Sequence, residues 1–175
     1  KNVVVSGDIG TGTSTLAKNL AVKLGWEHHS TGDFFRAYHL EHSIPLWNAS
    51  AIPAELDKQI DNYIFEQLCD KEHLVLDSHY AAWFARDLKN VFKILLTCDI
   101  EEVVRRVTTR THTHKETENE VLERIKQLDH KFRKLYAEES YLEPKYFDLI
   151  IDTTSSTPEK TLTKALSAIE KGLSK

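Results

Sequence analysis

Short apolar runs alternate with longer segments of helical periodicity along the chain. The apolar runs predict strands at residues 2–5, 73–76, 92–97 and 148–151. Between them, apolar side chains recur every three to four residues, which predicts helices at residues 13–24, 33–42, 53–69, 100–110, 118–139 and 158–173. Strands that alternate with helices are typical of an α/β fold: a central parallel sheet with helices on both faces, in three layers.

Two segments lack this clear periodicity. Residues 38–52 read as an irregular insertion, and residues 108–117 are polar and without an apolar face, which predicts a mobile connection between two helices. A chain of 175 residues is long enough for one well-buried core. We therefore expect a single domain over residues 1–175, with both segments as parts of it.

Composition and charge exclude several classes of function. A net charge of -4 argues against a nucleic-acid-binding face, because such faces need clustered Lys and Arg. No apolar run approaches the roughly 20 residues that cross a bilayer, so no membrane partner is expected. Cys69 and Cys98 lack C-x-x-C spacing, which fits reduced thiols in the cytoplasm rather than zinc or a disulfide. With no apolar stripe left for a partner, a monomer is expected.

The first predicted strand leads into a glycine-rich stretch, Gly-Asp-Ile-Gly-Thr-Gly-Thr-Ser-Thr, at the start of the first predicted helix. Its spacing follows the phosphate-binding pattern G-x-x-x-x-G-K-[ST], except that Thr13 stands where lysine is expected. Glycines let the backbone curl so that successive N–H groups point at phosphate oxygens, and the helix N-terminus adds positive potential. The stretch therefore predicts a nucleotide phosphate site formed by Gly7, Asp8, Ile9, Gly10, Thr11, Gly12, Thr13, Ser14 and Thr15.

The polar residues of this loop have separate expected roles. The Ser14 hydroxyl is placed to bind Mg²⁺, and Thr15 is placed near the α-phosphate. Thr13, in the place of the lysine, is expected to be a catalytic residue, and some other cation has to compensate for the missing charge. Asp8 is unusual, since a carboxylate repels phosphates unless a metal or arginine intervenes, and its side chain could simply point to solvent. The alternative is an ordinary turn whose hydroxyls cap the helix.

A second motif, Ser-Thr-Gly-Asp-Phe-Phe-Arg, spans residues 30–36. It resembles the S-T-G-[DE]-x-x-R segment of the nucleoside monophosphate kinases, and it follows the glycine loop at that family's interval. The resemblance implies that Arg36 holds the phosphate of the acceptor, with Thr31 and Asp33 in the same pocket. It also implies that residues 31–65 form an acceptor-binding insertion and residues 108–117 a lid. The alternative is that Thr31 or Asp33 caps a helix and Arg36 is solvated.

Within that family the chain is most similar to cytidylate kinases of the archaeal type, which also carry threonine in place of the loop lysine. The similarity includes residues 75–83, which resemble the family stretch V-[LI]-E-G-R-L-A-G-W, and residues 147–153. Asp77 stands where that pattern has glutamate, and His79 where it has arginine. Asp77-Ser78-His79 also resembles the D-x-H element of nuclear-type adenylate kinases. Asp77 ends a buried apolar strand, where parallel sheets place their ligand crevice, so we expect it to hold Mg²⁺ with Ser14, directly or through water. The resemblance implies that His79 faces the acceptor.

Phosphoryl transfer needs positive charge on the transferring oxygens. By resemblance, Arg106 would stack on the ATP base, and Arg110 and Arg124 would close onto the phosphates as catalytic residues. The alternative is that these arginines pair with nearby glutamates as surface salt bridges, and for Arg105 we prefer that interpretation.

These expectations define a kinase that uses ATP and Mg²⁺. The acceptor we expect is CMP or dCMP, and AMP is the second alternative. A small hydroxylated metabolite is a third alternative, which would need Asp33 as a base. A nucleotide-binding module without catalysis is the fourth. An ionised acceptor phosphate needs no base, so the nucleotide alternatives require none.

Overall fold

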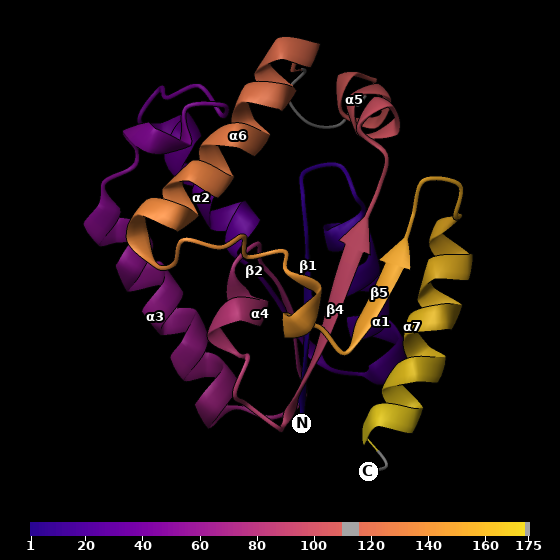
Figure 1. Ribbon diagram of the computed structural model, residues 1–175. Helices are drawn as coiled ribbons and strands as arrows, with labels where there is room; N and C mark the ends of the chain where they lie inside the picture. The colour runs from indigo at the N-terminus through magenta and orange to yellow at the C-terminus, as the bar shows by residue number, and fades with distance from the viewer. Residues whose placement is uncertain (110–115, 174–175) are drawn as a thin grey trace.

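The computed structural model describes residues 1–109 and 116–173, and it is built around one parallel sheet. The strands lie in the order β2-β3-β1-β4-β5, and neighbouring strands in this sheet are parallel (Figure 1). Their bounds are β1 (Asn2–Gly7), β2 (Glu27–Ser30), β3 (Leu74–Asp77), β4 (Val91–Thr97) and β5 (Leu149–Asp152). This confirms the predicted α/β class.

Helices cover both faces of the sheet. In chain order they are α1 (Thr13–Leu24), α2 (Thr31–Glu41), α3 (Ala54–Asp70), α4 (Ala81–Phe84), α5 (Ile100–Thr108), α6 (Glu118–Leu135) and α7 (Pro158–Leu173), with 3₁₀ turns η1 (Ala49–Ala51) and η2 (Pro144–Tyr146). Helices α1 and α7 pack on one face, and α3 and α4 on the other. Within the described residues, no helix is long and apolar enough to cross a membrane.

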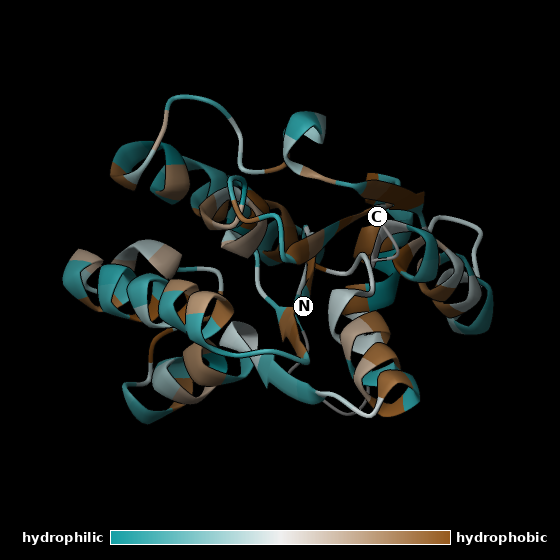
Figure 2. Ribbon diagram, turned by 90° about the horizontal axis from the view of Figure 1, so that it is seen from below, coloured by the Kyte–Doolittle hydropathy of each residue, from teal (hydrophilic) through white to brown (hydrophobic). Residues whose placement is uncertain are grey.

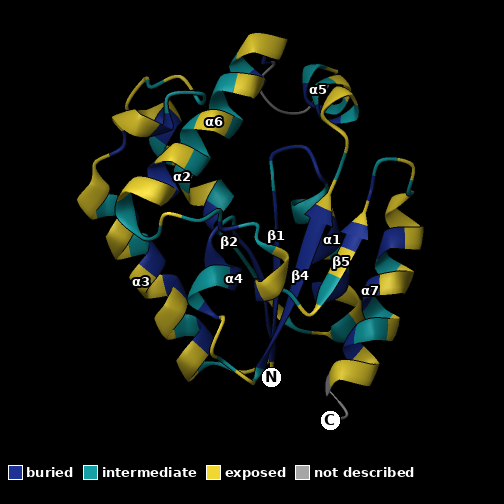
Figure 3. Ribbon diagram, viewed as in Figure 1, coloured by how far each residue is buried: buried dark blue, intermediate teal, exposed yellow. Residues whose placement is uncertain are grey.

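The alternation of side chains along β1 builds two cores. Val3 and Val5 pack with α1 and α7, whereas Val4 faces α3 and α4, and all three side chains are fully buried. Such a strand needs apolar residues on both faces, which explains its unbroken β-branched run. The central strands are accordingly apolar and buried, while the outer surfaces of the helices are polar and exposed (Figures 2 and 3).

The sequence missed one strand and extended one helix too far. Strand β2 has the sequence Glu-His-His-Ser and carries no apolar signal, yet it pairs with β3 at the sheet edge. The helix predicted over 118–139 begins with a Thr117–Glu120 capping box but ends at Leu135. The chain leaves the helix there, and Tyr141 then packs against Phe132 at 5.3 Å between ring centroids. A helix continued to residue 139 could not make this turn.

The segment predicted to be irregular is partly helical. Helix α2 extends to Glu41, and a left-handed residue, Ser43, follows at φ 54°. The 3₁₀ turn η1 then leads into α3. The other predicted connection, residues 108–117, begins with the last residue of α5, and its residues 110–115 lie outside the described part of the chain.

Buried charges lie where α3 meets α6. The Lys131 ammonium is 2.5 Å from the Asp57 carboxylate and donates to the carbonyl of Ala49 at 2.8 Å. One turn along α3, Asp61 accepts a hydrogen bond of 2.5 Å from the Tyr136 hydroxyl. Burial raises the pKa of Asp61 to about 7, the Tyr136 bond and Lys131 oppose the rise, and Asp57 adds to it.

The Asp61→Asn variant should therefore change the pH dependence of stability. A carboxyl whose pKa rises from 3.8 to about 7 on folding stabilises the fold below pH 4, and that contribution is lost as pH rises to about 7. The loss is on the order of 4 kcal/mol, at about 1.4 kcal/mol per pH unit. Asparagine does not titrate, so the variant should gain stability relative to the parent between pH 4 and pH 8. Urea unfolding at several pH values measures this, and a constant difference would contradict it.

Candidate active site

The carboxyl ends of the strands bring the predicted motifs together. In the sheet register Val5 pairs with Asp77, and Asp77 pairs with Ser30. The glycine loop follows β1, the Ser-Thr-Gly segment follows β2, and the Asp-Ser-His segment follows β3. Parallel sheets place their ligand crevice beyond this edge, so three motifs that are far apart in the sequence face one cleft.

The glycine loop has the curled backbone that phosphate binding requires. Gly10 and Gly12 have φ values of 77° and 98°, in the left-handed region that favours glycine, and α1 begins immediately after Gly12. At Gly7, a Cβ atom would lie 2.6 Å from the carbonyl oxygen of Leu96. The loop and the first turn of α1 line a concave site together with Asp77, Arg36 and Arg124.

Arg106 fastens this loop to the segment after β5. Its guanidinium donates to the carbonyl of Gly10 at 3.3 Å and to the carbonyl of Thr153 at 2.6 Å, while Glu102 accepts from its Nε. The Thr153 hydroxyl completes the link by donating to the carbonyl of Thr11 at 2.9 Å. Arg106 lines the broad cleft beside the loop, where base stacking stays a prediction. Arg105 pairs with Glu102 on the surface, which confirms the interpretation preferred for it.

Ser14 and Asp77 form an oxygen-rich pair at the mouth of the loop. The Ser14 hydroxyl donates to Asp77 Oδ2 at 2.5 Å, and the Ser30 hydroxyl lies 3.4 Å from the same oxygen. Hydroxyl and carboxylate oxygens are the ligands Mg²⁺ prefers, and such sites commonly use one carboxylate together with substrate phosphates. The donor set therefore fits the predicted metal.

His79 lies between the two parts of the cleft. Its Nδ1 donates to the carbonyl of Gly7 at 2.8 Å, so the ring is fastened to the end of β1. Burial lowers the pKa of His79, the bond to Gly7 opposes this, and Arg124 lowers it further. The ring is therefore held in a fixed orientation in its neutral form, where the family pattern has a permanent cation.

The sequence left open that the Asp8 side chain points to solvent, and the structure corrects this. Tyr141 donates to Asp8 Oδ1 at 3.2 Å, and Tyr141 is almost fully buried. Burial raises the pKa of Asp8, while His79 and the Tyr141 hydrogen bond oppose the rise. The carboxyl is thus held by Tyr141 and His79 rather than by solvent.

Two arginines supply positive charge to the cleft. Arg36 donates to Asp33 at 2.5 Å, and Arg124 reaches in from α6 and donates to Glu116 at 3.0 Å. Burial lowers the pKa of Arg124, and Glu116 opposes the fall. Thr13 lies beside them in the loop, and Thr15 is exposed at its rim. Arg110 lies outside the described residues.

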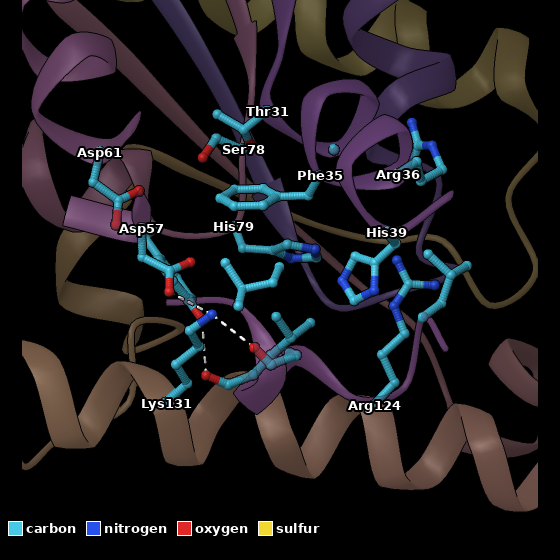
Figure 4. A pocket seen from close by; sticks show the side chains of 16 residues that line it. Thr31, Phe35, Arg36, His39, Asp57, Asp61, Ser78, His79, Arg124 and Lys131 are labelled. Carbon is cyan, nitrogen blue, oxygen red and sulfur yellow. Dashed lines mark hydrogen bonds and ion pairs between the residues drawn. The ribbon is translucent and has the colours of Figure 1, made fainter. Parts of the chain in front are cut away.

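A second cavity opens beside the phosphate site, between α2, α3 and α6 (Figure 4). Arg36, His79 and Arg124 line both cavities, and Thr31 lies on the wall they share. The far end of the second cavity is formed by Asp57, Asp61 and Lys131, which sequence reasoning missed. Asp57 and Asp61 are four residues apart, a spacing that puts them on one helix face, but surface carboxylates show the same spacing.

Comparisons with known proteins agree with this arrangement. A family model described as an AAA domain matches residues 3–126. The cytidylate kinase of Ignicoccus hospitalis is 33% identical over 90% of this chain and 92% of its own length, and that of Desulfurococcus amylolyticus is 31% identical over 97% and 92%. A solved gluconokinase structure from Sinorhizobium meliloti shares the fold, with a TM-score of 0.69 at 15% identity over 97% of this chain and 91% of that one.

The sequence matches cover nearly the whole chain. In this chain the glycine loop, the acceptor motif and the arginines line one cleft. The chain therefore belongs to the P-loop nucleoside monophosphate kinase family that includes the archaeal cytidylate kinases, and it is an ATP-dependent phosphotransferase.

Proposed function

We propose that this kinase transfers the γ-phosphoryl group of ATP to CMP and dCMP, giving ADP and the nucleoside diphosphate. One observation carries the proposal: the phosphate loop opens directly into a second cavity with two arginines at the near end and buried polar groups at the far end. A nucleoside monophosphate has the same polarity, with an anion at one end and hydrogen-bonding base edges at the other. Relatives named cytidylate kinase support the choice of base.

The proposed mechanism relies on positioning. The backbone N–H groups of the loop hold the ATP phosphates, and Arg36 holds the acceptor phosphate with Thr31 and Asp33 nearby. An ionised oxygen of that phosphate attacks the γ-phosphorus in line, a new P–O bond forms, and the bond to the β-phosphate oxygen breaks. Arg124 and Arg110 neutralise the transferring oxygens, which compensates for Thr13.

The metal is part of the same proposal. Ser14 and Asp77 would hold Mg²⁺ with the β- and γ-phosphates, and the metal when bound neutralises phosphate charge. His79 contacts the acceptor side as a neutral hydrogen-bonding group. Arg106 keeps its proposed place beside the ATP base, and residues 31–65 and 108–117 are the proposed acceptor cover and lid of one kinase domain.

The metabolite-kinase alternative is less well supported. Solved structures of a gluconokinase and a shikimate kinase share the fold, but at 15% and 18% identity they carry no information about the acceptor. A hydroxyl acceptor would need a free base, and Asp33 is engaged by Arg36 at 2.5 Å. Phosphorylation of AMP is the more serious alternative, because adenine also carries an amino group.

The first test measures ADP release with each ribo- and deoxynucleoside monophosphate offered separately. CMP or dCMP should be the best acceptor. In Arg36→Ala, kcat/KM for the acceptor should fall about 10- to 100-fold, because a charge-assisted contact to phosphate is lost, while the KM for ATP stays nearly unchanged. Arg133→Ala, which removes a comparable carboxylate pair with Asp129 on the surface of α6, is the control.

Two outcomes would contradict this proposal. If ATP binds but no monophosphate stimulates ADP release, the chain is not acting as a nucleoside monophosphate kinase, and shikimate and gluconate should then be offered. If Arg36→Ala and Arg133→Ala lose activity equally, Arg36 has no special role at the acceptor phosphate.

The metal site has its own test. Ser14→Ala and Asp77→Asn should each raise the half-saturating Mg²⁺ concentration about 10- to 100-fold, because each removes an oxygen ligand or its close partner. Thr163→Ala removes an exposed hydroxyl on α7 and is the control. The rate is measured against Mg²⁺ concentration at saturating ATP. An unchanged Mg²⁺ requirement in both variants would remove these residues from the metal site.

A further inference from the structure

We propose that Asp61 and Lys131 read the base of the acceptor and select a pyrimidine that carries an amino group over one that carries a carbonyl in the same place, with Asp57 as the positioning residue for Lys131. This inference rests on the proposed function, since it assigns specificity within the same acceptor cavity.

The cavity has two chemically different ends. Arg36 and Arg124 lie at one end, and the Asp57, Asp61 and Lys131 side chains lie at the other (Figure 4). Between them the wall is largely apolar, formed by Phe35, Leu46, Ile52 and Leu128 together with Tyr80. A nucleoside monophosphate whose phosphate meets the arginines therefore places the flat faces of its base along this wall and the far edge of the base against the carboxylates.

The groups at the far end are buried and have unused hydrogen-bonding capacity. The exposed fractions of Asp57, Asp61 and Lys131 are 4%, 5% and 8%. The ammonium of Lys131 has three N–H donors, of which Asp57 and Ala49 engage two. Asp61 uses Oδ2 to accept from Tyr136, and no other described residue donates to its Oδ1. One donor and one acceptor are thus available to the cavity.

A buried cluster of charged groups lowers the stability of the fold, so a role in ligand binding is the better explanation for it. Replacing buried ionic groups with apolar residues is often neutral or stabilising, so they are poor devices for stability. Asp61 is only 5% exposed yet lines the cavity, and burial raises its pKa, so its ionised form destabilises the fold. A hydrogen-bonding ligand at this end would pair with Asp61 Oδ1 and with the remaining N–H of Lys131.

The donor and acceptor pattern fits cytosine better than uracil. A carboxylate oxygen of Asp61 accepts from the exocyclic amino group, and the ammonium of Lys131 donates to the ring carbonyl or ring nitrogen. Above its pKa of about 7, Asp61 is ionised, and uracil would then place its O4 carbonyl against the carboxylate, so that two oxygens with lone pairs face each other. A site discriminates strongly against an analogue that leaves its buried polar groups unpaired. Discrimination by shape alone is much weaker.

The test compares CMP and UMP as acceptors in matched variants at about pH 8, where Asp61 is mostly ionised. In Asp61→Asn, the ratio of kcat/KM for CMP to kcat/KM for UMP should fall at least about 10-fold, because the amide N–H can donate to O4 and removes the repulsion. Lys131→Met should lower kcat/KM for both pyrimidines, and Lys131→Arg should restore part of it. The KM for ATP should change little in each variant.

Matched controls separate specificity from damage to the fold. Asp70→Asn on α3 and Lys134→Met on α6 remove the same charges at exposed positions of the same helices, and the ratio should stay as in the parent. Tyr136→Phe removes the hydrogen bond to Asp61 Oδ2 but keeps the Asp61 carboxylate, so it should also keep the preference for CMP. Circular dichroism and thermal unfolding identify any variant that fails to fold.

The outcomes distinguish this inference from the proposed function. If the parent phosphorylates CMP and folded Asp61→Asn keeps the parent's ratio, the assignment of Asp61 is wrong and the kinase assignment stands. A shift of the ratio in Tyr136→Phe as large as in Asp61→Asn would likewise overturn it in favour of a packing role. If the parent prefers AMP or GMP, the selection of an amino pyrimidine is wrong.

Discussion

The curled backbone between β1 and α1 is the constraint on which the rest of the structure depends. Its left-handed glycines, Gly10 and Gly12, allow the curl that phosphate binding by peptide N–H groups requires, and at Gly7 any side chain would collide with the neighbouring strand. The surrounding elements preserve this curl. Arg106 ties the carbonyl of Gly10 to the segment after β5, and Thr153 ties that of Thr11. Carbonyl oxygens that would repel phosphates are therefore turned away and neutralised.

The absence of the loop lysine changes where positive charge has to come from. Arg36 and Arg124 approach from helices that follow β2 and precede the last strand, and each is already paired with a carboxylate, Asp33 or Glu116. In the proposed mechanism, a phosphate group entering the cleft competes with these carboxylates for the same N–H groups. Nucleotide binding then becomes an exchange of partners rather than the neutralisation of free charges.

The sequence predicted the parts of the molecule whose chemistry is local. Gly7 to Thr15 could be recognised because a backbone curl requires glycine at fixed spacing, and α1 and α7 because their apolar residues recur at helical spacing. Strand β2 could not, because an edge strand of polar residues is specified by pairing with β3. The buried role of Asp8 depends on Tyr141, which is 133 residues away, and no local pattern reports that contact.

The acceptor cavity shows the same limit most clearly. Asp57, Asp61 and Lys131 look like ordinary surface charges in the sequence, since each sits among polar neighbours on an amphipathic helix. Only the packing of α3 against α6 buries them together, and only the position of the arginines gives the cavity a direction. Specificity is therefore encoded in how two helices meet, whereas the backbone that binds phosphate is encoded in one continuous loop. Relatives can keep such a loop and change acceptor by altering a few residues on those helices.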